Sequence, residues 1–341
     1  MSKSMVLKIN WSIFSKNRNA VYGVSILSIM VFHFFEDVLT SNFPGRLHFV
    51  GKVYNTLIGS VGVEWFVFLS GVGLYFSLKK DSNVKNYFEK RIKRILPTYV
   101  VVALLYWFIV DISLMKIGIN CFLSDFFFIT FFTQGTRTFW YVLFIFVAYS
   151  VYPLIYRLLE LQVDERAQLL MLATGALAIQ FIPRLLAGSL YSNIEILLGR
   201  FLIFFIGCWC GRKVYRKDII SIYDQMGFFF GILLMIGSRV PGIQSIVSKL
   251  GYRILMCFWG IFLLYVVTLV LERTPVGIVK CLEYFGSLSY ELYLTHVATR
   301  AFMKAIGLET YYIQNYILCI AVSIILSIGI RKVQRRKLHE V

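Results

Sequence analysis

Residues 21–38 read VYGVSILSIMVFHFFEDV, an apolar run that contains an ionisable side chain. Its length is that of a candidate transmembrane helix. His33 lies inside the run, and Glu36 and Asp37 follow one turn later on the same helical face. Ionisable residues are rare in a bilayer because inserting a charged one costs about 2.5–3.5 kcal/mol, and they usually face a functional cavity. This run therefore predicts a membrane enzyme rather than a scaffold.

The composition extends this prediction to a polytopic membrane protein. Hydrophobic residues make up 58% of the 341 residues, against about 45–50% in an ordinary soluble domain. The formal net charge is +17. We attribute this charge to membrane topology and not to nucleic-acid binding, because the basic residues flank apolar runs.

About ten apolar runs are candidates for membrane spans. They cover residues 21–38, 57–78, 95–112, 138–157, 167–186, 197–211, 226–237, 254–271, 285–302 and 316–330. Residues 121–132 form a shorter aromatic run, which we interpret as an interfacial or re-entrant segment. Most Lys and Arg fall on one side if both termini are cytoplasmic. We therefore expect an all-α multi-pass protein, one domain over residues 1–341, without a fused soluble domain.

Ionisable side chains from separate runs fall at a similar depth in the outer half of the membrane. Counted from the outer ends of the runs at 1.5 Å per residue, they lie roughly 5–10 Å deep. They are His33, Glu64, Arg200 and His296. Such a layer predicts an intramembrane polar cavity. No metal is expected there, because the histidines lack a ligand spacing such as H-x-x-x-H.

Several local patterns occur in a fixed order along most of the chain. They are YGVSILSIMVFH at 22–33, GVEWFVFLSGVGLYF at 62–76, YFEKRIKRILPTYV at 87–100, TFWYVLFIFVAYSVYPLIY at 138–156, GRFLIFFIGCWCGR at 199–212 and FGSLSYELYLTH at 285–296. Together they resemble the acyltransferase 3 family, bacterial membrane O-acyltransferases that modify surface polysaccharides. The family often has Arg or Lys where this chain has Tyr22, and Arg18, one turn earlier, is a candidate substitute.

The resemblance implies an acyl-CoA donor, most simply acetyl-CoA, and a hydroxyl of a cell-surface or lipid-linked glycan as acceptor. His33 would act as general base, since imidazole has an ordinary pKa of about 6.5. Glu64 or Asp37 would orient the ring, and the sequence does not decide between them. An acyl-histidine intermediate is the alternative.

The remaining site residues divide into two groups. Arg91 and Arg94 lie one turn apart at the cytoplasmic mouth of the third run, and with Arg18 they would bind the phosphates of the donor. A second group is expected to line the acceptor side of the cavity. It consists of Arg200, Trp140, Ser289, Tyr293 and His296.

Two other functional classes stay open. A transporter or flippase for lipid-linked oligosaccharides would also need polar residues in the membrane, but the chain lacks the paired repeats of many transporters. A polysaccharide polymerase would be expected to have a longer outer loop than residues 113–137. We expect the bacterial cytoplasmic (plasma) membrane as location, with membrane lipid, acyl-CoA and a glycan as partners. The sequence does not indicate an oligomeric state.

Overall fold

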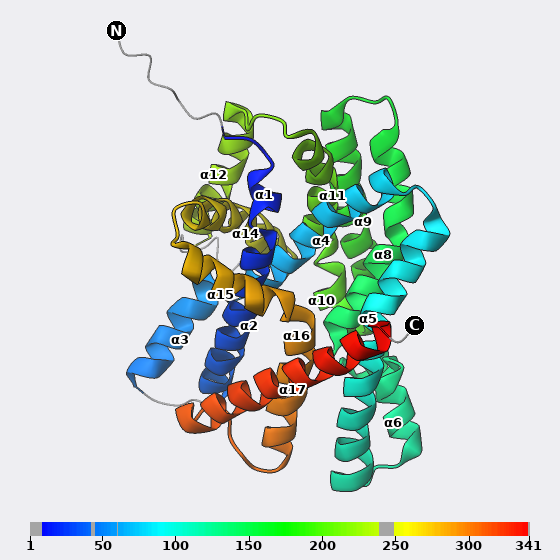
Figure 1. The fold of residues 1–341 in the computed structure, drawn as a ribbon, viewed down its shortest axis with the longest axis vertical. Coiled ribbons are helices and arrows are strands. Elements are labelled where there is room, and N and C mark those ends of the chain that lie inside the picture. Colours follow the sequence, from blue (N-terminus) through cyan, green and yellow to red (C-terminus); the bar gives the residue numbers. More distant parts are fainter. Residues whose placement is uncertain (1–8, 42–44, 60, 239–248, 340–341) are drawn as a thin grey trace.

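The computed structural model describes residues 9–41, 45–59, 61–238 and 249–339, with the side chains of 249–250 and 335–339 left aside. This part of the chain is helical almost throughout, and its β-structure is limited to one bridge between Asn10 and Ile219. Figure 1 shows the helices gathered in one bundle. The prediction of an all-α polytopic membrane protein is confirmed.

The helices follow one another in this order. The first half contains α1 (Ile13–Lys16), α2 (Arg18–Thr40), α3 (Arg46–Leu57), α4 (Val61–Lys80), α5 (Val84–Trp107), the π-helix η1 (Phe108–Leu114), α6 (Ile119–Phe126), α7 (Ile129–Gln134) and α8 (Trp140–Glu160). The second half contains α9 (Glu165–Leu186), α10 (Gly188–Leu198), α11 (Phe201–Arg216), α12 (Ile222–Gly237), α14 (Lys249–Leu271), α15 (Val276–Ser287), α16 (Ser289–Ala305) and α17 (Ile313–His339).

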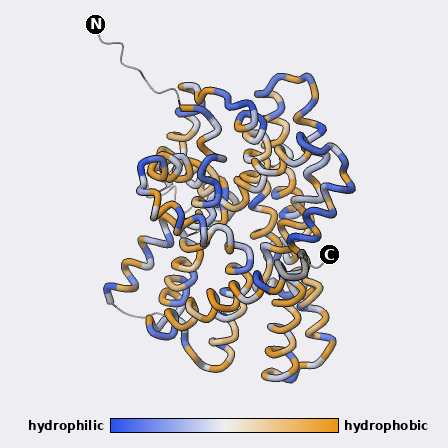
Figure 2. Tube along the Cα trace, viewed as in Figure 1, coloured by the Kyte–Doolittle hydropathy of each residue, from blue (hydrophilic) through white to orange (hydrophobic). Residues whose placement is uncertain are grey.

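Eight helical segments of the described chain are long and apolar enough to cross a membrane. They are Arg18–Thr40, Arg46–Lys80, Val84–Leu114, Trp140–Glu160, Glu165–Leu186, Gly188–Arg216, Gly251–Leu271 and Ile313–Gln334. The expected span at 226–237 lies in α12, which is apolar but shorter. Figure 2 shows hydrophobic residues along most helices and hydrophilic ones in loops along the upper edge. The number of crossings and their orientation stay predictions.

The expected span at 285–302 is interrupted near its start, because the chain turns at Leu288 between α15 and α16, and α16 covers the rest of it. The reason is the close packing of α15 on α2. Gly286 lies so near the start of α2 that a Cβ there would overlap the carbonyl oxygen of Asn19. This contact fixes α15 across α2, and α16 leaves it in a new direction (Figure 1). Further along, α16 contacts α2 through His296 and Arg300.

Helix α4 lies at the centre of the bundle and packs against α11 through small residues. A Cβ on Gly207 of α11 would overlap the carbonyl oxygen of Phe68 in α4. Small residues allow such close backbone approach between membrane helices. The shorter run at 121–132 forms α6 and α7, neither of which is long enough to cross a bilayer.

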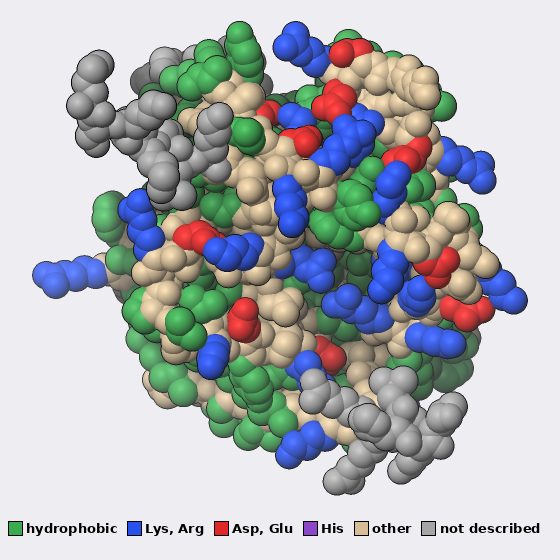
Figure 3. Space-filling view, turned by 45° about the horizontal axis from the view of Figure 1, so that its top comes forward, with side chains coloured by type: hydrophobic (Ala, Val, Ile, Leu, Met, Phe, Trp, Pro, Cys, Tyr) green, Lys and Arg blue, Asp and Glu red, His purple; other side chains and the backbone are tan. Residues whose placement is uncertain are grey.

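Figure 3 shows Lys and Arg side chains around a hollow on the face turned towards the viewer.

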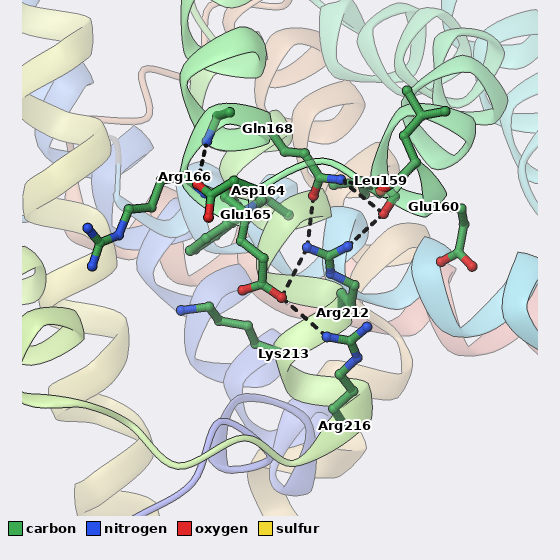
Figure 4. Close-up of polar contacts among 12 residues, drawn as sticks. Leu159, Glu160, Asp164, Glu165, Arg166, Gln168, Arg212, Lys213 and Arg216 are labelled. Carbon is green, nitrogen blue, oxygen red and sulfur yellow. Dashed lines mark hydrogen bonds and ion pairs between the residues drawn. The ribbon is translucent and has the colours of Figure 1, made fainter.

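Charged side chains hold several helix ends together. In Figure 4, Arg212 of α11 donates hydrogen bonds to the Leu159 carbonyl at 2.7 Å and to Gln168 Oε1 at 2.8 Å. Glu165 pairs with Arg212 at 3.1 Å and with Arg216 at 3.2 Å. Arg212 thereby satisfies a carbonyl near the end of α8 and joins α8, α9 and α11.

Candidate active site

A cavity of about 240 Å³ lies among α2, α4, α5, α8 and α16. It brings together residues that the sequence places far apart. The predicted site residues in its wall are Arg18, His33, Arg91, Arg94, Trp140, Ser289 and Tyr293. Donor-side and acceptor-side candidates therefore share one continuous space.

One part of the cavity wall is basic and lacks carboxylate partners. Among the described side chains, Arg18, Arg91 and Arg94 form no ion pair with Asp or Glu. Neighbouring Lys90, by contrast, donates a hydrogen bond to Asp81 at 2.9 Å, and this bond lowers the pKa of that carboxyl. The uncompensated positive charge lies where it can meet an anion from the cavity.

Arg18 reaches the cavity in the way that the sequence suggested. Its guanidinium carbon lies 5.8 Å from the centroid of the Tyr22 ring, and that ring stacks on Phe66 with centroids 5.3 Å apart. An Nη1 atom of Arg18 approaches Gly73 so closely that a Cβ there would lie 2.9 Å from it. Tyr22 thus occupies the cavity wall and Arg18 supplies the charge from one turn earlier.

His33 lies half-buried in the cavity wall, and its Nδ1 is buried without a hydrogen-bond partner. Its ring stacks on His296, with centroids 5.3 Å apart and planes inclined by 14°. His296 is fully buried, and the Tyr316 hydroxyl lies 3.2 Å from its Nε2. His296 was expected to line the acceptor side, and the structure places it next to His33 and outside the cavity wall. The cause is the direct packing of α16 against α2.

Asp37 does not contact the imidazole of His33. One turn further along α2, its carboxylate accepts hydrogen bonds from Arg300 Nε at 2.8 Å and from Thr310 Oγ1 at 2.6 Å, and it also pairs with Lys304. The structure therefore gives no contact for the expected orienting role of Asp37. Its carboxylate instead fixes α2 to α16, four residues from the histidine stack on both helices.

Glu64 is likewise occupied by another partner. It forms an ion pair with Arg200, and the two side chains are 1% and 3% exposed. Neither residue is in the cavity wall, although Arg200 was expected there, and the structure does not bring Glu64 to His33. The guanidinium carbon of Arg200 lies 5.8 Å from the ring centroid of Trp140, which does line the cavity. The ion pair therefore supports the cavity wall from behind.

Several cavity residues were not among the site residues predicted from the sequence. Tyr141, Ile145 and Tyr149 of α8 all line the cavity, and their spacing of four residues was the available signal. Tyr290 of α16 also lines it and donates a hydrogen bond to the Ile95 carbonyl at 3.0 Å. Ser70 of α4 lies in the same wall. The cavity is therefore rich in tyrosine hydroxyls and aromatic faces.

Comparison with known protein families gives one match. A family model described as an acyltransferase domain matches residues 19–332 of the 341. The match covers almost the whole chain. Neither the curated proteins nor the solved structures give a match.

Proposed function

Since this chain belongs to the acyltransferase 3 family, we propose that it is a bacterial membrane O-acyltransferase. It transfers an acyl group, most simply acetyl, from cytoplasmic acyl-CoA to a hydroxyl of a cell-surface or lipid-linked glycan. The observation that supports this most directly is the single cavity that joins His33 to Arg18, Arg91 and Arg94. A transferase that uses acyl-CoA needs a base and a phosphate site connected in this way.

The basic part of the cavity is the proposed site for the donor phosphates. Guanidinium groups bind phosphate oxygens in bidentate geometry. Since no carboxylate of the described chain is paired with these arginines, phosphate binding does not require an existing ion pair to break. Residues 18 and 33 lie about 22 Å apart along α2 at 1.5 Å per residue. An extended pantetheine arm has a length of that order, so the thioester can reach His33 while the nucleotide stays at the arginines.

His33 is the proposed general base. Its neutral imidazole takes the proton of the acceptor hydroxyl while the hydroxyl oxygen attacks the thioester carbonyl carbon. The carbon–sulfur bond then breaks, and the leaving thiolate takes the proton from the imidazolium. The products are an O-acyl ester and CoA. In the alternative route, the imidazole attacks first and carries the acyl group.

His296 is the proposed positioning residue for this base, in place of a carboxylate. Its stacked, fully buried ring restricts the orientation of His33. Trp140, Ser289 and Tyr293 line the cavity and are proposed to contact the acceptor. With the basic mouth cytoplasmic and His33 in the outer half of the membrane, donor and acceptor enter from opposite sides.

The test is transfer of radiolabel from acetyl-CoA to glycan by membranes that contain the wild type or a variant. His33→Ala should lower the rate roughly 10²–10⁴-fold, the usual effect of losing a general base. His48→Ala is the matched control, because His48 lies in α3 and does not line the cavity. A His33→Ala variant that keeps more than about a tenth of the rate would contradict the proposal. Glycan export without label incorporation would instead support a flippase.

A further inference from the structure

A second cluster of potential ligands lies at the end of α5, away from the cavity. Asp111 belongs to η1, and Cys121 and Asp125 belong to α6. One ligand atom from each of these side chains lies within 4.8 Å of the other two. The backbone that presents Asp111 is a π-helical turn, Phe108–Leu114. Such turns are rare and occur frequently at functional sites.

The two carboxylates of this cluster lack a cationic partner. Asp111 is 2% exposed, and its Oδ2 is buried without a hydrogen-bond partner. Asp125 is 8% exposed and accepts hydrogen bonds from Thr130 and from the Cys121 thiol. Among the described residues, neither Asp forms an ion pair with Lys or Arg. Burying an unpaired carboxylate oxygen is costly, and a bound cation would compensate the charge of both carboxylates.

We propose that Asp111, Cys121 and Asp125 bind a divalent transition-metal ion, with Zn²⁺ as the best match. A thiolate combined with carboxylates selects zinc over the hard cations Mg²⁺ and Ca²⁺. In tetrahedral zinc sites, bonds of about 2.0–2.3 Å place neighbouring ligand atoms roughly 3.3–3.7 Å apart. Cys121 Sγ and Asp125 Oδ2 are already 3.7 Å apart. Binding releases the thiol proton to solvent and leaves the thiolate on the metal.

A small polar cavity contacts the cluster at Asp125. This cavity of about 10 Å³, lined by Asp125, Thr130 and Trp107 among others, has the volume of one water molecule. Trp107 Nε1 is also buried without a hydrogen-bond partner. Of the three proposed ligand residues, only Asp125 lines this cavity, so a water there would bridge its carboxylate and Trp107 and leave the remaining zinc position to another ligand.

The metal would connect elements that are joined only by short loops. It would link η1 to α6, and the hydrogen bond between Thr130 and Asp125 extends the link to α7. Phe139 lines the small cavity, and the next residue, Trp140, lines the large one. The proposed ion would therefore stabilise the segment that precedes α8 and the start of the proposed active site.

The full-length protein, purified in detergent and stripped with a chelator, provides the test. After dialysis against Zn²⁺, the wild type should retain about one ion per chain, measured by elemental analysis. Cys121→Ser and Asp111→Asn should bind at least 10-fold more weakly, because removing even a group hydrogen-bonded to a metal ligand costs about 10–100-fold. Cys281→Ser is the matched control, since Cys281 is an exposed thiol elsewhere in the chain.

A second readout distinguishes a ligand from a structural residue. Co²⁺ bound to the wild type should give a thiolate charge-transfer band that is absent in Cys121→Ser and present in Cys281→Ser. Zn²⁺ should also raise the thermal unfolding midpoint of the wild type but not that of Cys121→Ser. Should Asp111→Asn fail to fold, the cysteine pair still decides the question. Substoichiometric zinc, or equal binding by wild type and Cys121→Ser, would overturn the proposal in favour of a proton shared between the carboxylates.

Discussion

Replacing one partner of the Glu64–Arg200 ion pair should be more damaging than replacing both. The two side chains are 1% and 3% exposed, so neither charge is solvated by water after the other is removed. Breaking a buried ion pair typically costs about 3–5 kcal/mol, whereas replacing both partners by apolar residues is often neutral or stabilising. We therefore expect Glu64→Met and Arg200→Met each to lose about 3–5 kcal/mol of unfolding free energy. The double variant should lie within about 1–2 kcal/mol of the wild type.

The assay is a double-mutant cycle on purified protein unfolded in mixed micelles and followed by tryptophan fluorescence. A coupling free energy of about 3 kcal/mol or more is expected, since the two side chains contact each other directly. The exposed pair Lys93–Glu89 at 3.7 Å provides the control, and its coupling should be about 0.3–0.5 kcal/mol. Additive effects of the two Glu64 and Arg200 substitutions would refute the reasoning, because each charge would then be solvated on its own.

Three further predictions concern the donor site, the proposed base and the sidedness of the chain in the membrane. Arg91→Ala should raise the apparent KM for acyl-CoA roughly 10–100-fold, because it removes charge-assisted hydrogen bonds worth about 1.5–3 kcal/mol, and the control Lys93→Ala should leave this KM unchanged. If Arg91→Ala has the same KM as the wild type, Arg91 serves membrane topology alone. His296→Ala should lower kcat up to about 10²-fold, because the His33 ring is then held less firmly in its orientation. His296→Phe keeps a flat ring and should restore much of kcat without a change in the KM for the donor. If the two variants have equally low kcat, ring stacking does not position His33. In a functional variant without native cysteines, an impermeant thiol reagent applied to intact cells should label a cysteine at position 188 and not one at 215, and the reverse pattern would contradict the proposed sidedness.

The positions of the site residues along the helices could be predicted from the sequence. Helical rise places His33 and His296 at similar depths, and the structure stacks their rings. The i, i+3 spacing of Arg91 and Arg94 predicted a shared basic mouth, and both line the cavity. Arg18 was found because it lies one turn before Tyr22, and helical geometry alone brings it to the same wall.

The pairing between helices could not be predicted in this way. Depth says nothing about which face of one helix meets which neighbour, so the sequence offered either Glu64 or Asp37 as the partner of His33. Their actual partners, Arg200 and Arg300, come from helices distant in the sequence. The break at Leu288 was missed for a similar reason, because it follows from a backbone contact with α2 rather than from a local breaker. The π-helical turn that holds Asp111 also lacks a local sequence signal.

The proposed assignment of roles in this protein follows from which charged side chains are paired and which are not. Glu64 and Asp37 lie at membrane depth, but each has a basic partner that compensates its charge. The pairing of Glu64 is incomplete, because its Oε2 and the Nε of Arg200 are buried without a hydrogen-bond partner among the described residues. Compensation of this kind is missing, within the described chain, for the arginines of the cavity mouth, and the Nδ1 atom of His33 has no hydrogen-bond partner. In the proposed function, an anionic donor would bind the arginines and a hydroxyl acceptor would bind at His33, and each would supply an interaction that these side chains lack within the described chain.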